Sequence, residues 1–346
     1  MAKKRLKSLD PDTVVPWLAS TFKAHGQPGL IAGVGEDDCG VIQIGNSVLV
    51  VSADFLNATP IAEQLNLGGE RVLGRIAVAA TLADLLGTGA RPRGMVVAAT
   101  IPHGFAQARF KELMLGVQYE CRRWRVPVIS GDTKLGAARA LLTCGFGTAS
   151  SKRQLFLANR ARPDDVLFTS GNLGTCATAA FVLGLVKTAP RWARRAITTP
   201  QLPVTRSRNL SELQIANAGI DVSDGLAADL RRMCAASDVG AVLEVDRIPI
   251  DPHVTEVAKR EHVSPWAFAL ASGGDFQFLV TVPRTAANAA EKLGFTRIGF
   301  VTRERSLWIA NNNGDRRQLP LLGHKDRKGQ RFVDEIRRII RQVARG

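Results

Sequence analysis

The sequence is short of the residues that build a disulfide framework or a soft-metal site. Its histidines form no HExxH motif and no close cluster. No two of its five cysteines form a CxxC pair; they are Cys39, Cys121, Cys144, Cys176 and Cys234. An odd number of scattered cysteines argues against a disulfide framework and a zinc centre, and it is typical of a reducing compartment.

Long apolar segments are also missing. The longest runs, such as residues 179–186, are far below the ~20 residues that cross a bilayer. The opening stretch, MAKKRLKSLDPDT, is basic, but no apolar segment of a signal peptide follows it. We therefore expect a cytoplasmic protein that does not enter a membrane.

Acidic residues are few in this chain of 346 residues. Lysine and arginine number 46 against 31 aspartates and glutamates, so the net charge is +15. Basic clusters occur in KKRLK, in RWARRA (191–196) and over residues 325–345. A soluble, positively charged surface is the simplest interpretation, and anionic, phosphorylated small molecules are the next. Nucleic acid is disfavoured, because the chain has one tyrosine and no basic segment interleaved with aromatic residues.

Apolar periodicity predicts a mixture of helices and strands in irregular order. Helices are expected at 9–25, 69–87, 105–124, 175–186 and 332–343. Strands are expected at 41–51, 95–101, 126–129, 140–148, 165–170, 241–245 and 278–282. This order favours an α+β fold over an alternating parallel sheet. A polar stretch at 150–153 divides the chain into an N-terminal domain, 1–150, and a C-terminal domain, 151–346, that ends in a basic helix.

Six short segments place aspartate beside small residues in this acid-poor chain. They are GVGEDDCG (33–40), VSADF (51–55), LADLLGTGARP (82–92), ISGDTKLG (129–136), DVSDG (221–225) and ASGGDFQF (271–278). Each alone is typical of a cap, a turn or a solvated loop. Asp84, however, lies in an apolar helix on a face that should be buried.

Together these segments predict a metal-dependent phosphate site. Converging carboxylates repel one another and stay ionised only with cations between them. Magnesium takes hard oxygen ligands and bridges carboxylates to nucleotide phosphates. Neither a Walker-A loop, a kinase HRD or DFG motif nor a GxSxG elbow occurs. The turn GNLGTCATAA (171–180) is a possible phosphate-binding turn without the GxGxxG spacing.

The order of these motifs resembles the superfamily of aminoimidazole ribonucleotide synthetase, selenophosphate synthetase, the hydrogenase maturation dehydratase and thiamine-monophosphate kinase. The last of these is the most similar, and DVSDGLAADL and SGGD carry the most specific part of the resemblance. The resemblance implies a two-domain fold, an N-terminal sheet completed in a homodimer, and ATP bound with several Mg²⁺ ions.

Matching positions imply roles for individual residues. The resemblance implies metal ligation by Asp38, Ser52, Asp54, Asp84, Asp132, Asp221 and Asp224. It implies nucleotide contacts from Gly131, Asp132 and Ser223, with Lys134 as additional positive charge beside the phosphates. We expect Asp54, Asp132 and Asp224 to be required for catalysis, which would proceed by positioning and charge stabilisation.

The chain departs from the kinase pattern at positions that the resemblance assigns to binding of the acceptor substrate. Ala53 replaces a threonine, Ile61 replaces a substrate-contacting histidine, and Asp275 stands alone where the kinases have Glu-Asp. A late tryptophan has no match near Leu321. We therefore predict an ATP- and Mg²⁺-dependent phosphotransferase whose acceptor need not be thiamine monophosphate. The alternatives are an ATP-dependent ligase or cyclase of the aminoimidazole ribonucleotide synthetase type, and a non-catalytic nucleotide- or nucleic-acid-binding relative.

Overall fold

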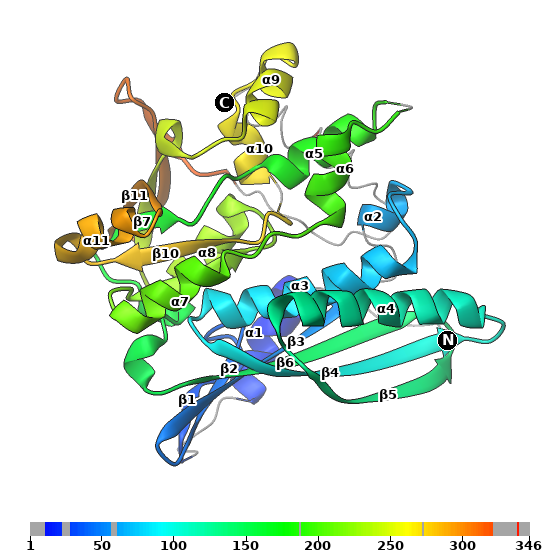
Figure 1. The fold of residues 1–346 in the computed structure, drawn as a ribbon. Coiled ribbons are helices and arrows are strands. Elements are labelled where there is room, and N and C mark those ends of the chain that lie inside the picture. Colours follow the sequence, from blue (N-terminus) through cyan, green and yellow to red (C-terminus); the bar gives the residue numbers. More distant parts are fainter. Residues whose placement is uncertain are drawn as a thin grey trace, which may run out of the picture.

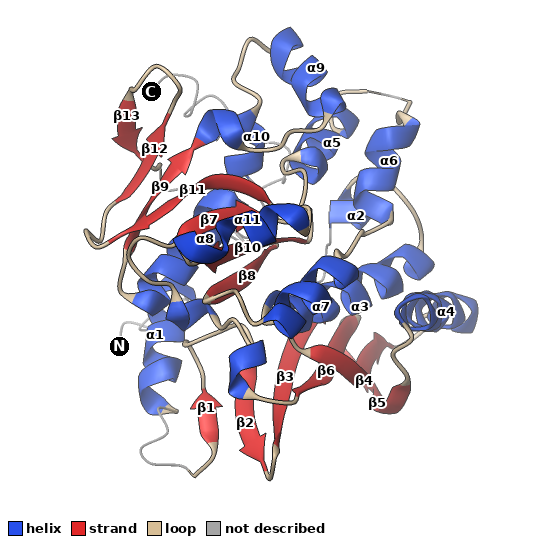
Figure 2. Cartoon of the chain, turned by 60° about the vertical axis from the view of Figure 1, so that its left-hand side comes forward, coloured by secondary structure: helices blue, strands red, loops and turns tan. Residues whose placement is uncertain are grey.

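Two β-sheets, one in each half of the chain, form the framework of the protein (Figures 1 and 2). The structure is a computed structural model and describes residues 11–22, 28–56, 61–186, 188–271, 273–320 and 338. The N-terminal sheet has the strand order β1-β2-β3-β6-β4-β5, and the C-terminal sheet has the order β13-β12-β9-β11-β7-β10-β8. Neighbouring strands are antiparallel except for the parallel pairs β4–β5 and β9–β12.

In the N-terminal half, helices cover one face of the sheet. The strands are β1 (Leu30–Ala32), β2 (Gly40–Ile44), β3 (Ser47–Leu56), β4 (Arg91–Pro102), β5 (Val128–Gly136) and β6 (Ala140–Ala149). The helices are α1 (Pro11–Thr21), α2 (Ile61–Gln64), α3 (Glu70–Gly87) and α4 (Gln107–Trp124). Every second residue of β6 is buried, because α3 and α4 lie over the sheet (Figure 1).

The sheet of the C-terminal half is more deeply buried than the sheet of the N-terminal half. Its strands are β7 (Val166–Thr169), β8 (Ala218–Val222), β9 (Gly240–Glu244), β10 (Gln277–Val282), β11 (Thr296–Thr302), β12 (Leu307–Ala310) and β13 (Arg316–Gln318). Its α-helices are α5 (Thr175–Leu183), α6 (Arg191–Thr198), α7 (Val204–Leu213), α8 (Leu226–Ser237), α9 (Pro252–Arg260), α10 (Trp266–Ala271) and α11 (Ala287–Lys292). Short 3₁₀ turns are η1 (Lys152–Gln154), η2 (Ala158–Arg160), η3 (Val245–Arg247) and η4 (Arg284–Ala286). All five residues of β8 are buried, including Asp221.

The two halves meet where the end of α3 presses against β8. A Cβ atom on Gly87 would lie 2.9 Å from the backbone nitrogen of Asp221, and one on Gly219 would lie 2.7 Å from the Gly87 carbonyl oxygen. The Ser207 hydroxyl of α7 donates a hydrogen bond to the Leu86 carbonyl oxygen at 2.6 Å. Glycine at this crossing lets α3 approach β8 closely, and so it brings Asp84 toward Asp221.

The α+β fold predicted from the sequence is confirmed, while several boundaries are wrong. Helix α5 ends at Leu183, earlier than expected. The strands expected to end at 51 and 129 continue to Leu56 and Gly136, so the segments VSADF and ISGDTKLG lie inside β3 and β5. Of the expected helix at 332–343, all residues but 338 lie outside the described part of the chain. Among the described residues, no helix has both the length and the apolar character needed to cross a bilayer.

Replacing Gly74 by Ala should destabilise the protein at the crossing of α3 and α4. A Cβ atom on Gly74 would lie 2.1 Å from the Leu113 carbonyl oxygen, so the two helix backbones would have to separate. We expect a loss of about 1–3 kcal/mol in the free energy of unfolding, measured by urea denaturation. Gly40→Ala is the control, because its nearest contact would be an ordinary 3.9 Å. Equal effects of the two substitutions would contradict this account.

Candidate functional site

Three carboxylates from distant parts of the chain meet where the two halves join. Asp38 lies in the loop before β2, Asp84 lies on α3, and Asp221 lies in β8. One oxygen atom from each lies within 4.8 Å of the other two. Three oxygens at this spacing can ligate a single cation. The gathering of these predicted residues agrees with the expectation from the sequence motifs.

Burial makes this carboxylate cluster electrostatically costly. Burial raises the pKa of Asp84 and of Asp221 well above its ordinary value, and the neighbouring carboxylates raise it further. The Oδ2 atom of Asp221 is buried and has no hydrogen-bond partner among the residues that the structure describes. A buried carboxylate without a partner is strongly disfavoured unless a proton or a cation offsets its charge. The arrangement therefore fits a bound divalent cation.

Strand β3 brings two further predicted residues to the cluster. Ser52 and Asp54 are two residues apart, so their side chains lie on the same face of the strand. The Ser52 hydroxyl donates a hydrogen bond to Oδ2 of Asp84 at 2.5 Å. Burial raises the pKa of Asp54 to about 6, with an added contribution from the charge of Asp38. Asp54 therefore shares the electrostatic environment of the cluster, and Ser52 orients one of its members.

An arginine that the sequence analysis missed lies among these acids. Arg232 of α8 approaches Asp38 at 3.6 Å and Asp224 at 3.4 Å through its Nη1 atom. Its Nη2 atom contacts Asp229 at 2.5 Å. The only signal in the sequence is the three-residue spacing of Asp229 and Arg232, which is common on helices. Arg232 is a partial countercharge for the cluster, with 43% of its side chain exposed.

Asp229 and Asp37 fix the loops that carry the cluster. The Oδ2 atom of Asp229 accepts hydrogen bonds from the backbone nitrogens of Asp224 and Gly225, both at 3.1 Å. The carboxylate of Asp37 accepts from Ala158 at 2.6 Å and from Cys39 at 2.9 Å. Burial raises the pKa of Asp229 to about 8 and that of Asp37 to about 7. These two aspartates act as structural anchors of the DVSDG and GVGEDDCG segments.

Of the remaining predicted residues, the three on β5 lie apart from the cluster, and Ser223 lies near it. Gly131, Asp132 and Lys134 belong to β5, and strands β6 and β4 separate β5 from β3. Lys134 lies 3.5 Å from Asp132, and both side chains are more than half exposed. A Cβ atom on Gly131 would lie 2.2 Å from the Val97 carbonyl oxygen, so this glycine allows close pairing with β4. Ser223 lies near the cluster, with its hydroxyl 3.4 Å from Asp221 Oδ1.

The turn at 171–180 is closed by an internal carboxylate. Asp275 accepts hydrogen bonds from the backbone nitrogens of Gly174 at 2.6 Å and Cys176 at 2.8 Å. Those nitrogens begin α5 and are the groups that a phosphate would have used. The suggestion that this turn binds phosphate is therefore wrong for the structure as it stands. Asp275, separated from the turn by about a hundred residues, gave no local signal of this contact.

Fold and site together define a two-domain α+β protein with a carboxylate cluster at the domain junction. A family model described as the N-terminal domain of AIR synthase related protein matches residues 36–149, and the model of the C-terminal domain matches residues 162–307. The chain belongs to the AIR synthase related family. Within it, the chain is similar to thiamine-monophosphate kinases, which confirms the resemblance expected from its motifs.

Individual relatives show the extent of this similarity. The thiamine-monophosphate kinase of Pyrococcus abyssi is 29% identical over 79% of this chain and 84% of its own length. The crystal structure of thiamine-monophosphate kinase from Stenotrophomonas maltophilia K279a has a TM-score of 0.67 and 27% identity, over 82% of this chain and 92% of that one. The complex of AaThiL with AMPPCP and TMP has a TM-score of 0.79 at 19% identity, over 94% of this chain and 100% of that one, and shows a shared fold.

Replacing Asp54 by Asn should stabilise the cation-free protein in a pH-dependent manner. Because the pKa of Asp54 is raised in the folded protein to about 6, its protonation favours folding, and this contribution is lost as the pH rises through that value. Without divalent cations we expect Asp54→Asn to exceed wild type by on the order of 2 kcal/mol at pH 8 and to match it near pH 4. Urea unfolding at both pH values measures the difference.

The matched control is Glu304→Gln, which removes an exposed charge outside the cluster. It should change the free energy of unfolding little at either pH. If Asp54→Asn is less stable than wild type at pH 8, then the Asp54 carboxylate is not repelled by its neighbouring carboxylates.

Proposed function

We propose that the protein is an ATP- and Mg²⁺-dependent phosphotransferase, similar to thiamine-monophosphate kinase, that acts on an anionic, phosphorylated small molecule. The observation that carries this proposal is the meeting of Asp38, Asp84 and Asp221 within 4.8 Å, where the buried Oδ2 of Asp221 has no hydrogen-bond partner among the described residues. Relatives that align over 79% and more of this chain are thiamine-monophosphate kinases. The complex of AaThiL with AMPPCP and TMP supports a nucleotide and a phosphorylated acceptor.

The cluster fits Mg²⁺ better than a softer metal. The six ligands in this proposal all offer oxygen: Asp38, Ser52, Asp54, Asp84, Asp221 and Asp224. Carboxylate and hydroxyl oxygens are hard ligands that suit Mg²⁺, which also retains water and phosphate oxygens. When bound here, Mg²⁺ would neutralise the triphosphate of ATP and the carboxylates that surround it.

The side chains of the chain itself would align the reactants. Ser52 holds the Asp84 carboxylate through its hydrogen bond, and Asp229 holds both the DVSDG turn and Arg232. The exposed part of the Arg232 guanidinium would offer positive charge to phosphate oxygens. Because the clustered carboxylates would be engaged with the cation, transfer would go directly from ATP to the acceptor.

A second copy of the chain would complete the nucleotide site. All but the last residue of the edge strand β5 are exposed, among them the apolar Val128, Ile129 and Leu135. An exposed apolar edge strand is typical of a surface that pairs with another chain. In the proposed homodimer, Asp132, with Gly131 and Lys134, would reach the cluster of the other subunit, from which it is separated within its own chain.

The acceptor would occupy a cavity of about 640 Å³ beside the cluster. Its lining includes Arg195, Arg206 and His253 together with the carboxylates of Asp251 and Asp275. The rings of Trp192 and His253 are stacked with centroids 4.6 Å apart. Cationic side chains beside flat rings suit an anion that carries a planar group.

Two glycines connect this acceptor cavity to the cluster. A Cβ atom on Gly273 would lie 1.9 Å from the Ser223 carbonyl oxygen, and one on Gly274 would lie 2.8 Å from the Cys176 sulfur. The Gly273–Gly274 backbone therefore lies between the DVSDG turn and the lining of the cavity, and it contacts both. An acceptor in this cavity would need only a short reach to a nucleotide at the cluster.

Mixed dimers test the shared site. Asp54→Asn and Asp132→Asn should each abolish ATP turnover with little loss of fold stability. Co-expressing the two variants should restore about a quarter of wild-type turnover, because half of the dimers would hold one intact site. Differently tagged subunits, purified through both tags, isolate these dimers. No recovery in dimers purified in this way would remove Asp132 from the partner's site.

Thiamine monophosphate itself tests the acceptor. Incubation with ATP and Mg²⁺ should give little thiamine diphosphate, because Ala53, Ile61 and Asp275 depart from the kinase pattern. Phosphorus NMR follows the products. Robust turnover would refute the altered acceptor while leaving the phosphotransferase intact. Release of ADP and free phosphate with an amide or carboxyl substrate would favour the ligase or cyclase alternative.

A further inference from the structure

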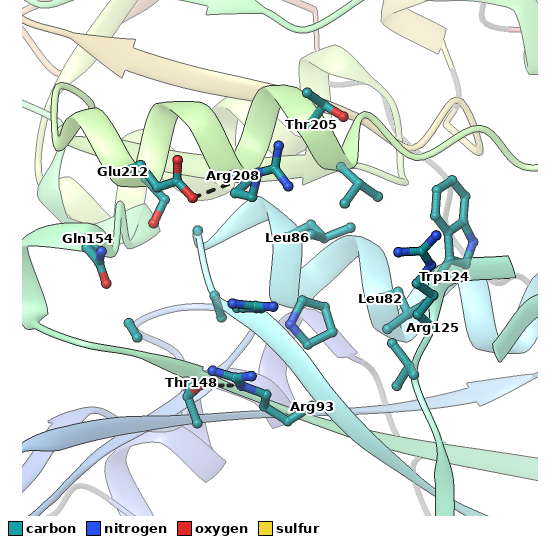
Figure 3. A pocket seen from close by; sticks show the side chains of 18 of the residues that line it. Leu82, Leu86, Arg93, Trp124, Arg125, Thr148, Gln154, Thr205, Arg208 and Glu212 are labelled. Atoms are coloured by element: carbon teal, nitrogen blue, oxygen red, sulfur yellow. Dashed lines mark hydrogen bonds and ion pairs between the residues drawn. The ribbon is translucent and has the colours of Figure 1, made fainter. Parts of the chain in front are cut away.

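A cavity of about 860 Å³ lies where the two halves of the chain meet, and it includes none of the clustered carboxylates (Figure 3). Its walls come from the beginning of β4, the end of α4, the end of β6 and the exposed side of α7. Figure 3 shows Arg93 and Thr148 on one side and Arg208 and Glu212 on the opposite side. A molecule in this cavity would touch both halves of the chain.

The lining is strongly cationic. One carboxylate, Glu212, lines it against five arginines, which define the arginine groove: Arg91, Arg93, Arg123, Arg125 and Arg208. Arg123 is paired with the buried Glu120 at 2.8 Å, but the positive charge of the other guanidinium groups would strongly attract a multivalent anion.

Two of these arginines are available to a ligand. The side chains of Arg91 and Arg125 are exposed and have no hydrogen bond or ion pair to any residue that the structure describes. Arg93 donates to the Thr148 hydroxyl at 2.8 Å, and Arg208 lies 3.8 Å from Glu212 in an exposed pair. Exposed pairs of this kind contribute little and exchange partners readily.

The inner surface of the groove is apolar. Val204 and the indole of Trp124 line it, together with Leu82, Leu86 and Val126, which are at most 4% exposed. Arg123 stacks on the Trp124 ring with its guanidinium carbon 4.5 Å from the centroid. Apolar surface with one aromatic ring, next to several guanidinium groups, matches a ligand with a planar apolar body and a phosphate tail.

Helix α3 separates the arginine groove from the carboxylate cluster. Leu82 and Leu86 line the groove, while Asp84 between them belongs to the cluster. Residues two apart on an α-helix project to nearly opposite sides. The groove is therefore a separate site and not an extension of the proposed ATP site.

We propose that the arginine groove binds a nucleoside phosphate or a similarly built phosphorylated small molecule, without a divalent cation, and so links the two halves of the chain. The volume lies within the range of small-molecule sites. A single aromatic side chain lines the groove, whereas single-stranded nucleic acid is usually held by several stacking rings. This inference goes beyond the proposed phosphotransferase and does not depend on it.

Calorimetric titration of the full chain with ATP in EDTA tests the groove, because carboxylates without Mg²⁺ repel a triphosphate. Wild type should bind about one ATP per chain, and Arg91→Gln/Arg125→Gln should weaken this binding at least about tenfold. The control Arg162→Gln/Arg303→Gln removes two exposed arginines outside the groove and should bind as wild type does. Asp54→Asn should also bind as wild type does, which separates this test from that of the phosphotransferase.

Three results would overturn the proposal. They are an absence of saturable ATP binding in EDTA, an equal loss in the control variant, and displacement of ATP by a uridine oligonucleotide that binds far more tightly. The last result would assign the groove to nucleic acid. If the double variant does not fold, Arg208→Gln, on the α7 side of the groove, should weaken ATP binding in the same way. Circular dichroism checks the fold of each variant.

Discussion

Repulsion among closely spaced carboxylates is the constraint on which the rest of the site depends. Asp38, Asp84 and Asp221 share a space only 4.8 Å across, and burial opposes the ionisation of each. Arg232 offsets part of this charge, yet its ion pairs are with Asp38, Asp224 and Asp229, and the buried Oδ2 of Asp221 keeps no partner. The site is thus built for positive charge that the described chain does not itself supply, which is the physical basis for proposing Mg²⁺.

The buried and clustered aspartates of this chain have two different roles. Asp37, Asp229 and Asp275 accept hydrogen bonds from backbone nitrogens and hold loops in place. The clustered acids instead face one another and receive few such bonds. The anchors are necessary because repulsion would otherwise move the loops of the cluster apart. Glycines at the junction of α3 and β8 let the two elements approach closely, since a Cβ atom on Gly87 or Gly219 would meet neighbouring backbone atoms.

The residue patterns were sufficient to predict the α+β fold and a set of converging carboxylates, and the resemblance to the kinase family pointed to Asp38, Asp84 and Asp221 among them. The sequence was insufficient wherever a contact joins distant segments. Strand order separates Asp132 from the cluster within one chain, and no local pattern reveals strand order. Asp275 closes a turn a hundred residues away for the same reason. Arg232 was missed because its spacing from Asp229 is ordinary for any helix.

Charge of opposite sign is kept on opposite sides of α3. Asp84 belongs to the carboxylate cluster, whereas Leu82 and Leu86 line the arginine groove. With a net charge of +15, the surface as a whole attracts polyanions, and an acidic pocket would repel them unless metal were bound. Metal would therefore decide which of the two sites an anion enters. A nucleotide without Mg²⁺ would favour the cationic groove, and a nucleotide carrying Mg²⁺ would favour the carboxylate cluster. The two sites on either side of α3 would then differ in the form of nucleotide that they bind because they differ in charge.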